Sequence, residues 1–166
     1  MKRPASLIAA TVLVATLSAC GFQLRGSDGR AAIPFKTIYL GVADTSPLGI
    51  ELRRNIRARD TTIVTDPKMA DASVQILAET RDKSILTLNT QGRIREYSLL
   101  YLLRFRVVDQ SGKELIAPTD ISLKRDISFN ESQVIAKEKE EDLLYRDMQS
   151  DAVQQILRRL SALRST

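Results

Sequence analysis

Residues 97–107 read YSLLYLLRFRV, and this stretch decides the fold. Every second side chain in it is large and apolar, whereas the positions between them hold a serine and two arginines as well as leucines. A period of two is typical of a β-strand, because successive side chains point to opposite faces of the sheet. The apolar positions are Tyr97, Leu99, Tyr101, Leu103, Phe105 and Val107. The stretch therefore predicts a long antiparallel strand with one buried face, and it places its tyrosines in the core rather than against a ligand.

The alternation continues on both sides of this strand. In residues 74–88 it assigns one face to Val74, Ile76, Ala78, Leu86 and Leu88. It assigns the opposite face to Gln75, Glu79, Arg81 and Lys83. In residues 115–129 the apolar face comprises Leu115, Ala117, Ile121, Leu123, Ile127 and Phe129. The connecting sequences NTQGR (89–93) and DQSG (109–112) are typical of turns, so the three strands are predicted to form a meander.

The sequence before residue 74 predicts a strand, a helix and a further short strand. Residues 35–40, FKTIYL, are rich in β-branched and aromatic side chains, as strands are. Ser46 and Pro47 mark a helix start, with the serine as N-cap and the proline at the first helical position. Every fourth residue after them is apolar, which gives this helix one buried face. Residues 61–65 are consistent with a short edge strand.

Residues 132–163 predict one long helix, because their apolar side chains fall within about half of a helical wheel. These side chains are Leu144, Tyr145, Met148, Ala152, Ile156, Leu160 and Leu163. A sheet with one apolar face and two helices with apolar stripes pack as a two-layer sandwich. We therefore expect an α+β fold in the order β-α-β-β-β-α, with a mostly antiparallel four-stranded sheet and both helices on one face. Residues 33–166 are predicted to form a single domain.

The composition excludes most catalytic chemistry. The chain has 166 residues, no histidine, no tryptophan and a single cysteine, Cys20. Without histidine there is no Ser-His-Asp or Cys-His catalysis and no histidine-ligated zinc. One cysteine forms neither an internal disulfide nor a multi-thiolate metal cluster. A small hydrolase would need a nucleophile such as a Ser-Lys pair, which nothing marks, so we expect no enzymatic activity, no cofactor and no metal site.

The first twenty residues predict an export signal. Lys2 and Arg3 precede an uncharged run at 7–17, LIAATVLVATL. A helix of this length spans only about 16 Å, too little for a hydrocarbon core of about 30 Å, so residues 1–19 are assigned to a signal peptide. An ordinary secretory signal with a chance cysteine, or a short N-terminal anchor, is the alternative. Cleavage would remove Lys2 and Arg3 from a chain of net charge +5, which argues against nucleic acid as a partner.

The tetrapeptide LSAC at 17–20 resembles the lipobox of bacterial lipoproteins. In that class a diacylglycerol thioether forms on the cysteine, cleavage occurs just before it, and the new amine is acylated. The resemblance implies a covalent N-acyl diacylglycerol on Cys20, followed by a lipidated tether at residues 20–32. Gly21 stands where an aspartate typically retains lipoproteins in the inner membrane. The implied location is therefore the periplasmic side of the outer membrane.

Three segments stand out: CGFQLR at 20–25, GRIREY at 92–97, and residues 123–146, where a Phe-Asn turn leads into Ala-Lys-Glu. Together they resemble the LptE family of lipopolysaccharide-assembly lipoproteins. The resemblance implies a non-enzymatic protein that plugs the LptD β-barrel of the outer membrane. It also implies contact with lipopolysaccharide through basic groups and a part in its insertion into the outer leaflet. An auxiliary lipoprotein of a periplasmic lipid-transport complex is the alternative function.

Basic side chains next to apolar ones are the candidates for binding lipopolysaccharide, whose phosphates are carried on a lipid. The candidates are Arg93, Arg95, Lys124, Arg125 and Lys137. Arg93 and Arg95 flank Ile94 at a predicted hairpin tip, and Lys137 occupies the position of a basic residue in the family's Ala-Lys segment. Cations at hairpin tips and on strand faces are also typical of a solvated surface. The run KEKEED at 137–142 mixes both signs and indicates an exposed first helical turn.

Overall fold

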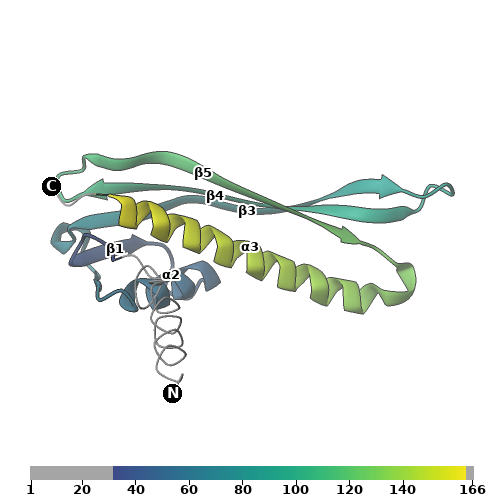
Figure 1. Ribbon diagram of the computed structural model, residues 1–166, viewed down its shortest axis with the longest axis horizontal. Coiled ribbons are helices and arrows are strands. Elements are labelled where there is room, and N and C mark those ends of the chain that lie inside the picture. The colour runs from purple at the N-terminus through teal and green to yellow at the C-terminus, as the bar shows by residue number, and fades with distance from the viewer. Residues whose placement is uncertain (1–31, 164–166) are drawn as a thin grey trace, which may run out of the picture. The chain divides into compact units, whose positions relative to one another are not determined.

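The structure, a computed structural model, describes residues 32–163, which form a mixed β-sheet covered on one face by helices (Figure 1). The strands are β1 (Thr37–Gly41), β2 (Thr62–Val64), β3 (Ala72–Leu88), β4 (Ile94–Asp109) and β5 (Glu114–Ser128). The helices are α2 (Pro47–Arg57) and α3 (Val134–Ala162), and two short 3₁₀ turns are η1 (Pro67–Met69) and η2 (Glu131–Gln133). The predicted α+β class, with helices on one side of the sheet, is confirmed.

The prediction of a mostly antiparallel sheet of four strands is wrong in its strand number, because the short edge strand expected at 61–65 joins the sheet as β2, and the sheet is mixed. The sheet has five strands in the order β2-β1-β3-β4-β5, and β1 runs parallel to both β2 and β3. Because α2 connects β1 to β2, the two strands form a β-α-β crossover, which joins parallel strands. The predicted meander is present, since β3 pairs with β4 and β4 pairs with β5 in antiparallel register.

The start of α2 follows the predicted capping pattern. The Ser46 hydroxyl accepts a hydrogen bond from the backbone N–H of Gly49 at 3.0 Å, and Pro47 occupies the first helical position. Position 49 needs glycine, because a Cβ there would lie 2.4 Å from the carbonyl oxygen of Ala43. The apolar side chains of this helix, Leu48, Leu52 and Ile56, are fully buried.

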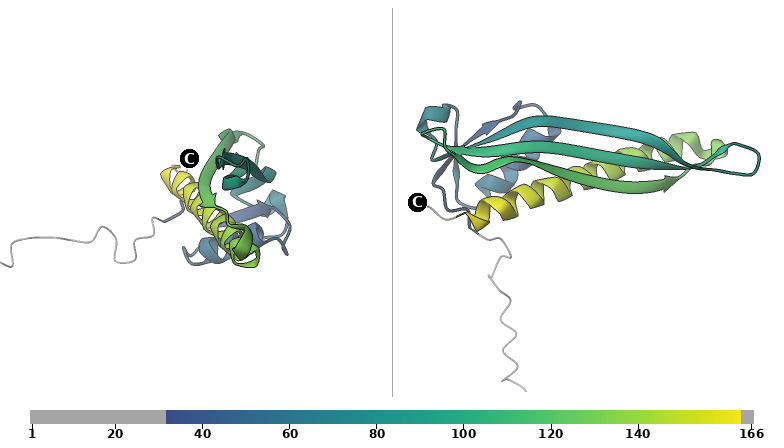
Figure 2. Two further views of the ribbon diagram at one scale, coloured as in Figure 1. Left: turned by 90° about the vertical axis from the view of Figure 1, so that its right-hand side faces the viewer. Right: turned by 90° about the horizontal axis from the view of Figure 1, so that it is seen from above.

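The C-terminal helix α3 is continuous over 29 residues and runs along the helix-covered face of β4 and β5 (Figures 1 and 2). It begins two residues later than predicted, because residues 131–133 form the tighter turn η2. Within residues 32–163, no helix has the length and apolar character needed to cross a membrane.

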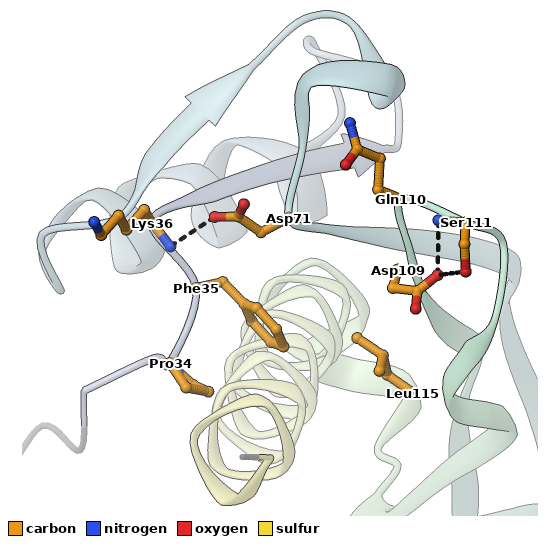
Figure 3. A pocket seen from close by; sticks show the side chains of 8 residues that line it. All are labelled: Pro34, Phe35, Lys36, Asp71, Asp109, Gln110, Ser111 and Leu115. Carbon is orange, nitrogen blue, oxygen red and sulfur yellow. Dashed lines mark hydrogen bonds between the residues drawn. The ribbon is translucent and has the colours of Figure 1, made fainter. Parts of the chain in front are cut away.

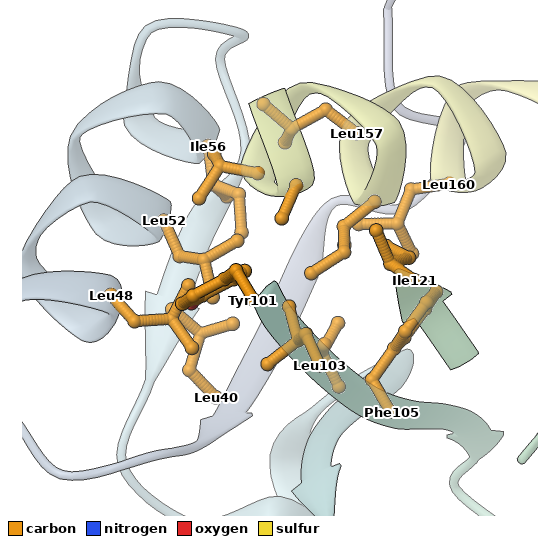
Figure 4. Close-up of a cluster of buried hydrophobic side chains, with 14 of the residues drawn as sticks. Leu40, Leu48, Leu52, Ile56, Tyr101, Leu103, Phe105, Ile121, Leu157 and Leu160 are labelled. Carbon is orange, nitrogen blue, oxygen red and sulfur yellow. The ribbon is translucent and has the colours of Figure 1, made fainter. Parts of the chain in front are cut away.

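The core lies between the sheet and the two helices (Figure 4). β4, the middle strand of the meander, supplies the largest side chains, Tyr101 and Phe105, and both are fully buried. Leu52 of α2 and Leu157 and Leu160 of α3 close over them. Burial of each such aliphatic side chain contributes about 1.5–3 kcal/mol, so this contact holds the helices to the sheet.

A β-bulge at Leu77 reverses the face assignment predicted for most of β3. Ile76 lies opposite Phe105, but the next paired residue is Ala78, opposite Arg104, so Leu77 is an extra residue. Cross-strand partners share a face, and one extra residue moves the side chains that follow it to the other face, as far as the next register shift between Ile85 and Thr87. The predicted outward row of Glu79, Arg81 and Lys83 therefore faces the helices, opposite Leu103, Tyr101 and Leu99. Leu86 and Leu88, also predicted to be buried, lie at and beyond the further register shifts of this strand and are 41% and 55% exposed.

Candidate functional site

The turn between β3 and β4 is built by an asparagine and a glycine. The Asn89 side-chain oxygen accepts hydrogen bonds from the backbone N–H groups of Gln91 (3.0 Å) and Arg93 (2.9 Å). Gly92 has a φ of +76°, in the left-handed region that favours glycine. The turn lies beyond the first turn of α3 (Figure 1). We call residues 89–95 the hairpin tip.

Arg93 and Arg95, the predicted pair, both lie on this hairpin tip and are exposed. The Arg93 side chain is 68% exposed, and its Nη1 lies 3.3 Å from Oε2 of Glu131 in η2. Arg95 falls at a register shift, because Glu96 pairs with Thr87 while Ile94 pairs with Leu88. Its carbonyl accepts a hydrogen bond from the Phe129 N–H at 2.7 Å. Within the described part of the chain its guanidinium has no ion pair, so both cations are open to an external anion.

Lys137, at the start of α3, is held by its neighbours. Its side chain is only 17% exposed, and Nζ donates to the Ser128 hydroxyl at 3.0 Å and to Oε2 of Glu140 at 2.8 Å. It lines a small cavity of about 60 Å³ together with Tyr97 and Phe129, whose rings meet edge to face at 5.3 Å. An anion would therefore have to replace a carboxylate to reach Lys137.

Lys124 and Arg125 lie on opposite faces of β5 and away from the hairpin tip. Arg125 points toward α3, where Nη2 lies 2.8 Å from Oδ2 of Asp151. Lys124 lies on the uncovered face, 3.8 Å from Asp126, with 58% of its side chain exposed. Lys124 is four residues along β5 from Ser128, which is a separation of about 13 Å. The structure thus brings together Arg93, Arg95 and Lys137 at one end of the sheet and leaves the other two apart.

Lys139 is a further basic residue at this end that the sequence analysis did not single out. It lines an open hollow of about 700 Å³ beside η2 and the start of α3, together with the apolar Val134 and Ile135. The first turn of α3 has neither a side-chain cap nor an acidic residue. The positive end of the helix dipole therefore lies on the same side of the domain as Lys139. The sequence did not single out Lys139, because it lies in the mixed-charge run 137–142. The face of the helix on which Lys139 lies is known only once the helix is seen to start at residue 134.

The charged row of β3 forms a polar seam under the helices. Nη2 of Arg81 donates to the side-chain oxygen of Gln149 at 3.2 Å, and the Arg81 guanidinium lies 5.5 Å from the ring centre of Tyr145. The Tyr101 hydroxyl donates to Glu79 at 2.9 Å. Burial raises the pKa of Tyr101, and the bond to Glu79 raises it further. Each group has a partner in the fold, so the seam fixes the helices on the sheet and presents no reactive group.

A second cleft, of about 690 Å³, lies at the other end of β4 (Figure 3). Its two carboxylates serve the backbone. Asp71 accepts from the N–H groups of Lys36 (3.0 Å) and Thr37 (2.8 Å), and these bonds, led by Thr37, lower its pKa. Asp109 accepts from the backbone N–H of Ser111 at 2.8 Å and from its hydroxyl at 2.7 Å, and the hydroxyl bond is the larger cause of its lowered pKa. Among the described residues, no group of three metal-ligating side chains could hold a metal ion.

Comparison with known proteins supports a single family. The LptE family model, described as lipopolysaccharide-assembly, matches residues 35–160. The LPS-assembly lipoprotein LptE of Pectobacterium atrosepticum is 28% identical over 143 residues, which are 85% of this chain and 76% of that protein. Its counterpart in Yersinia enterocolitica is 28% identical over 156 residues, covering 93% of this chain and 73% of that protein.

Solved structures show the same fold. The solution structure of an uncharacterized lipoprotein B from Nitrosomonas europaea is 38% identical, with a TM-score of 0.73, over 86% of this chain and 91% of that one. The rare lipoprotein B from Shewanella oneidensis, at 24% identity and a TM-score of 0.68, covers 76% of this chain and 94% of that one. The family match spans β1 to the end of α3, which includes the hairpin tip. The chain therefore belongs to the LptE family of lipopolysaccharide-assembly lipoproteins.

Proposed function

We propose that this protein is a lipid-anchored component of a lipopolysaccharide translocon in the outer membrane. It binds lipopolysaccharide, forms a complex with an LptD-type β-barrel whose lumen it plugs, and assists insertion of lipopolysaccharide into the outer leaflet. Membership of the LptE family supports the process, and the exposed Arg93 and Arg95 on the hairpin tip support direct contact with the lipid. The observation that carries the proposal is this pair of accessible guanidiniums within a family-matched domain.

Attachment to the membrane rests on Cys20, which lies outside the described residues. An N-acyl diacylglycerol on this cysteine would hold the protein on the periplasmic side of the outer membrane. Each buried CH₂ contributes about 0.8 kcal/mol, and several chains together give stable anchoring. The anchor limits the folded domain to the space next to the bilayer, where the barrel and its lipid substrate lie.

Recognition of the lipid begins at the hairpin tip. A guanidinium presents its donors in a planar fork that matches two phosphate oxygens, and Ile94 supplies an apolar contact between the two arginines. Arg93 already donates to one carboxylate oxygen, of Glu131, so a phosphate replaces a weak, exposed ion pair. Binding of lipid A phosphates here would weaken the association of lipopolysaccharide molecules with one another and deliver single molecules to the barrel.

Lys124, Arg125 and Lys137 stay candidates for a later contact. Arg125 and Lys137 each have a carboxylate partner at 2.8 Å, which the lipid phosphate would have to displace. Lys124 has a longer ion pair, of 3.8 Å, and lies on the uncovered sheet face. That face carries paired charges such as Arg104 and Asp120, which suit the polar, hydrated lumen of a barrel.

Charge reversal at the hairpin tip tests the lipid contact. The full-length acylated protein with Arg93→Glu and Arg95→Glu is compared with wild type for binding to lipopolysaccharide. We expect at least tenfold weaker binding, because two charge-assisted contacts become repulsive. The matched control reverses two exposed arginines of α3, Arg146→Glu and Arg158→Glu, and keeps the wild-type affinity. Unchanged affinity in the hairpin-tip variant would refute the site.

Co-purification tests the partner. The acylated protein isolated from detergent-solubilised outer membranes should carry a large β-barrel protein in stoichiometric amount. Recovery with an inner-membrane or soluble complex instead, after cross-linking in cells, would favour the auxiliary lipid-transport function.

A further inference from the structure

Residues 84–88, SILTL, form the outward edge of β3 next to the hairpin tip, and we call them the edge segment. From Ser84 to Gly92 the chain carries no charge. Within the edge segment, Ile85 is 56% exposed, Leu86 is 41% exposed and Leu88 is 55% exposed. Three large exposed apolar side chains within five residues need an explanation, because soluble surfaces rarely keep such groups together without a partner.

The edge segment is open on its outer side. β1 pairs only with residues 72–75 of β3, and in the described part of the chain no other strand lies beside the rest of that edge. Open edges are usually protected by charged side chains. The middle of β3 has this protection, at Glu79, Arg81, Asp82 and Lys83. The protection stops at Lys83, where the edge segment begins.

The geometry of the edge segment is poorly suited to pairing with another strand. Register shifts lie between Ile85 and Thr87 and again between Thr87 and Leu88. Such bulges disturb the regular ladder of backbone hydrogen bonds that an added strand would need. Hydrocarbon chains make no directional bonds, so irregular backbone does not weaken their contact with exposed leucines.

The edge segment also lies next to the cations of the proposed phosphate site. Leu88 is paired with Ile94, and Ile94 lies between Arg93 and Arg95. Directly paired residues have Cβ atoms about 5 Å apart. Apolar and cationic groups are therefore close enough to contact one amphiphilic molecule, and the first acidic residue on this hairpin after Asp82 is Glu96.

We propose that Ile85, Leu86 and Leu88 bind the acyl chains of the phosphorylated glycolipid whose phosphates contact Arg93 and Arg95. The inference rests on the proposed function and adds a second chemical class of contact to it. The hairpin then binds a lipid-linked phosphate more tightly than a free phosphorylated sugar. Only the lipid-linked phosphate contacts both the two arginines and the apolar side chains of the edge segment.

Two ligands distinguish the acyl-chain contact at the edge segment from the phosphate contact at the two arginines. The full-length acylated protein, kept in one neutral detergent, is titrated with lipid A and with deacylated lipopolysaccharide, which retains the phosphates. The variant Leu86→Ser with Leu88→Ser should bind lipid A about tenfold more weakly than wild type and bind the deacylated ligand equally well. Arg93→Gln with Arg95→Gln should weaken both ligands. The matched control is Ile50→Ser on α2, which is 55% exposed, as Leu88 is, and lies outside the hairpin.

A fluorescence measurement gives an independent readout. The chain has no tryptophan, so Leu88→Trp introduces a unique probe. Its emission should shift to shorter wavelength with lipid A and stay unchanged with the deacylated ligand. Ile50→Trp should respond to neither.

The other outcomes decide against the inference in distinguishable ways. Equal affinity of the serine variant and wild type for lipid A overturns the acyl contact and leaves the phosphate site standing. Failure of wild type to bind either ligand refutes the proposed function, and the inference with it. If the serine variant keeps its lipid A affinity and loses the co-purifying barrel, the edge segment is a protein-docking strand and the inference is wrong.

Discussion

Tyr101 joins the apolar core to the polar seam. Its ring is fully buried, while its hydroxyl donates to Glu79 at 2.9 Å and the Arg81 guanidinium lies 5.9 Å from its ring centre. Burial is the larger cause of its raised pKa, and the bond to Glu79 adds to it. The neutral phenol is therefore the form that the fold stabilises.

This gives a prediction for alkaline pH. In the unfolded chain a tyrosine ionises near pH 10, whereas the raised pKa keeps Tyr101 protonated in the fold above that pH. The stability that Tyr101 contributes is complete below about pH 10 and is lost as the pH rises further. Tyr101→Phe should lose about 1 kcal/mol at pH 7, and its difference from wild type should shrink above pH 10. Urea unfolding at several pH values measures this.

The control is Tyr39→Phe, at a tyrosine whose hydroxyl makes no hydrogen bond among residues 32–163. This variant should show the same fall in the free energy of unfolding at alkaline pH as wild type. A Tyr101→Phe variant whose difference from wild type stays constant from pH 7 to pH 11 would contradict the pKa assignment.

The five candidate cations show where residue-level prediction succeeds and fails. Their type and their nearness to apolar groups could be read from the sequence, and Arg93 and Arg95 do lie exposed on a hairpin tip. The carboxylate partners of these cations could not be predicted from the sequence, because they come from distant segments of the chain. Asp151 binds Arg125 from 26 residues away, and Glu131 binds Arg93 from 38 residues away. The difference in side-chain exposure between Arg93 and Lys137 therefore becomes visible only in the folded structure.

At the scale of elements, the bulge at Leu77 has the largest consequence. The alternation of β4 predicted its buried face, and in β5 Ile121 and Ile127 are buried as expected. Ala117, predicted on the same face of β5, is exposed, because the pairing of β5 with β4 shifts between Ile116 and Thr119. In β3 the run Ile76-Leu77-Ala78 gives no sign of which residue is extra. The parallel direction of β1 was missed for a similar reason, because a short strand has the same pattern in either direction.

Deleting Leu77 tests the bulge. The deletion would remove the extra residue and turn Glu79, Arg81 and Lys83 away from the helices, together with the contacts that they make. We expect loss of the cooperative thermal transition or a large fall in Tm. Deleting Thr90 in the exposed turn is the matched control and should change Tm by only a few degrees. Equal Tm values for the two deletions would show that the register is wrong.

At the scale of the whole molecule, the described domain has two ends of different character. One end holds α2, β1 and β2 and a cleft whose carboxylates bond the backbone. The other end holds the hairpin tip, the edge segment and the start of α3, where exposed cations and apolar groups gather. A protein that transfers an amphiphile needs this second kind of surface, and it needs to stay at the membrane.

Membrane attachment gives a whole-molecule prediction. Cys20→Ser removes the only thiol that could carry a diacylglycerol. The variant should be released from the outer-membrane fraction or remain as an unprocessed precursor, because no other covalent lipid site is expected. Fractionation and intact-mass measurement of the native protein check this. Native protein with an unmodified cysteine would contradict the anchor.

Lipopolysaccharide contact at the hairpin tip is the central claim, and a cross-link in living cells tests it most directly. A photoreactive amino acid replaces Ile94, between Arg93 and Arg95, and in a second strain it replaces Ile50 on α2. Irradiation should give a lipopolysaccharide adduct from position 94 and none from position 50. The same adduct yield from both positions, or no adduct from position 94 in protein that is correctly acylated, would contradict the account.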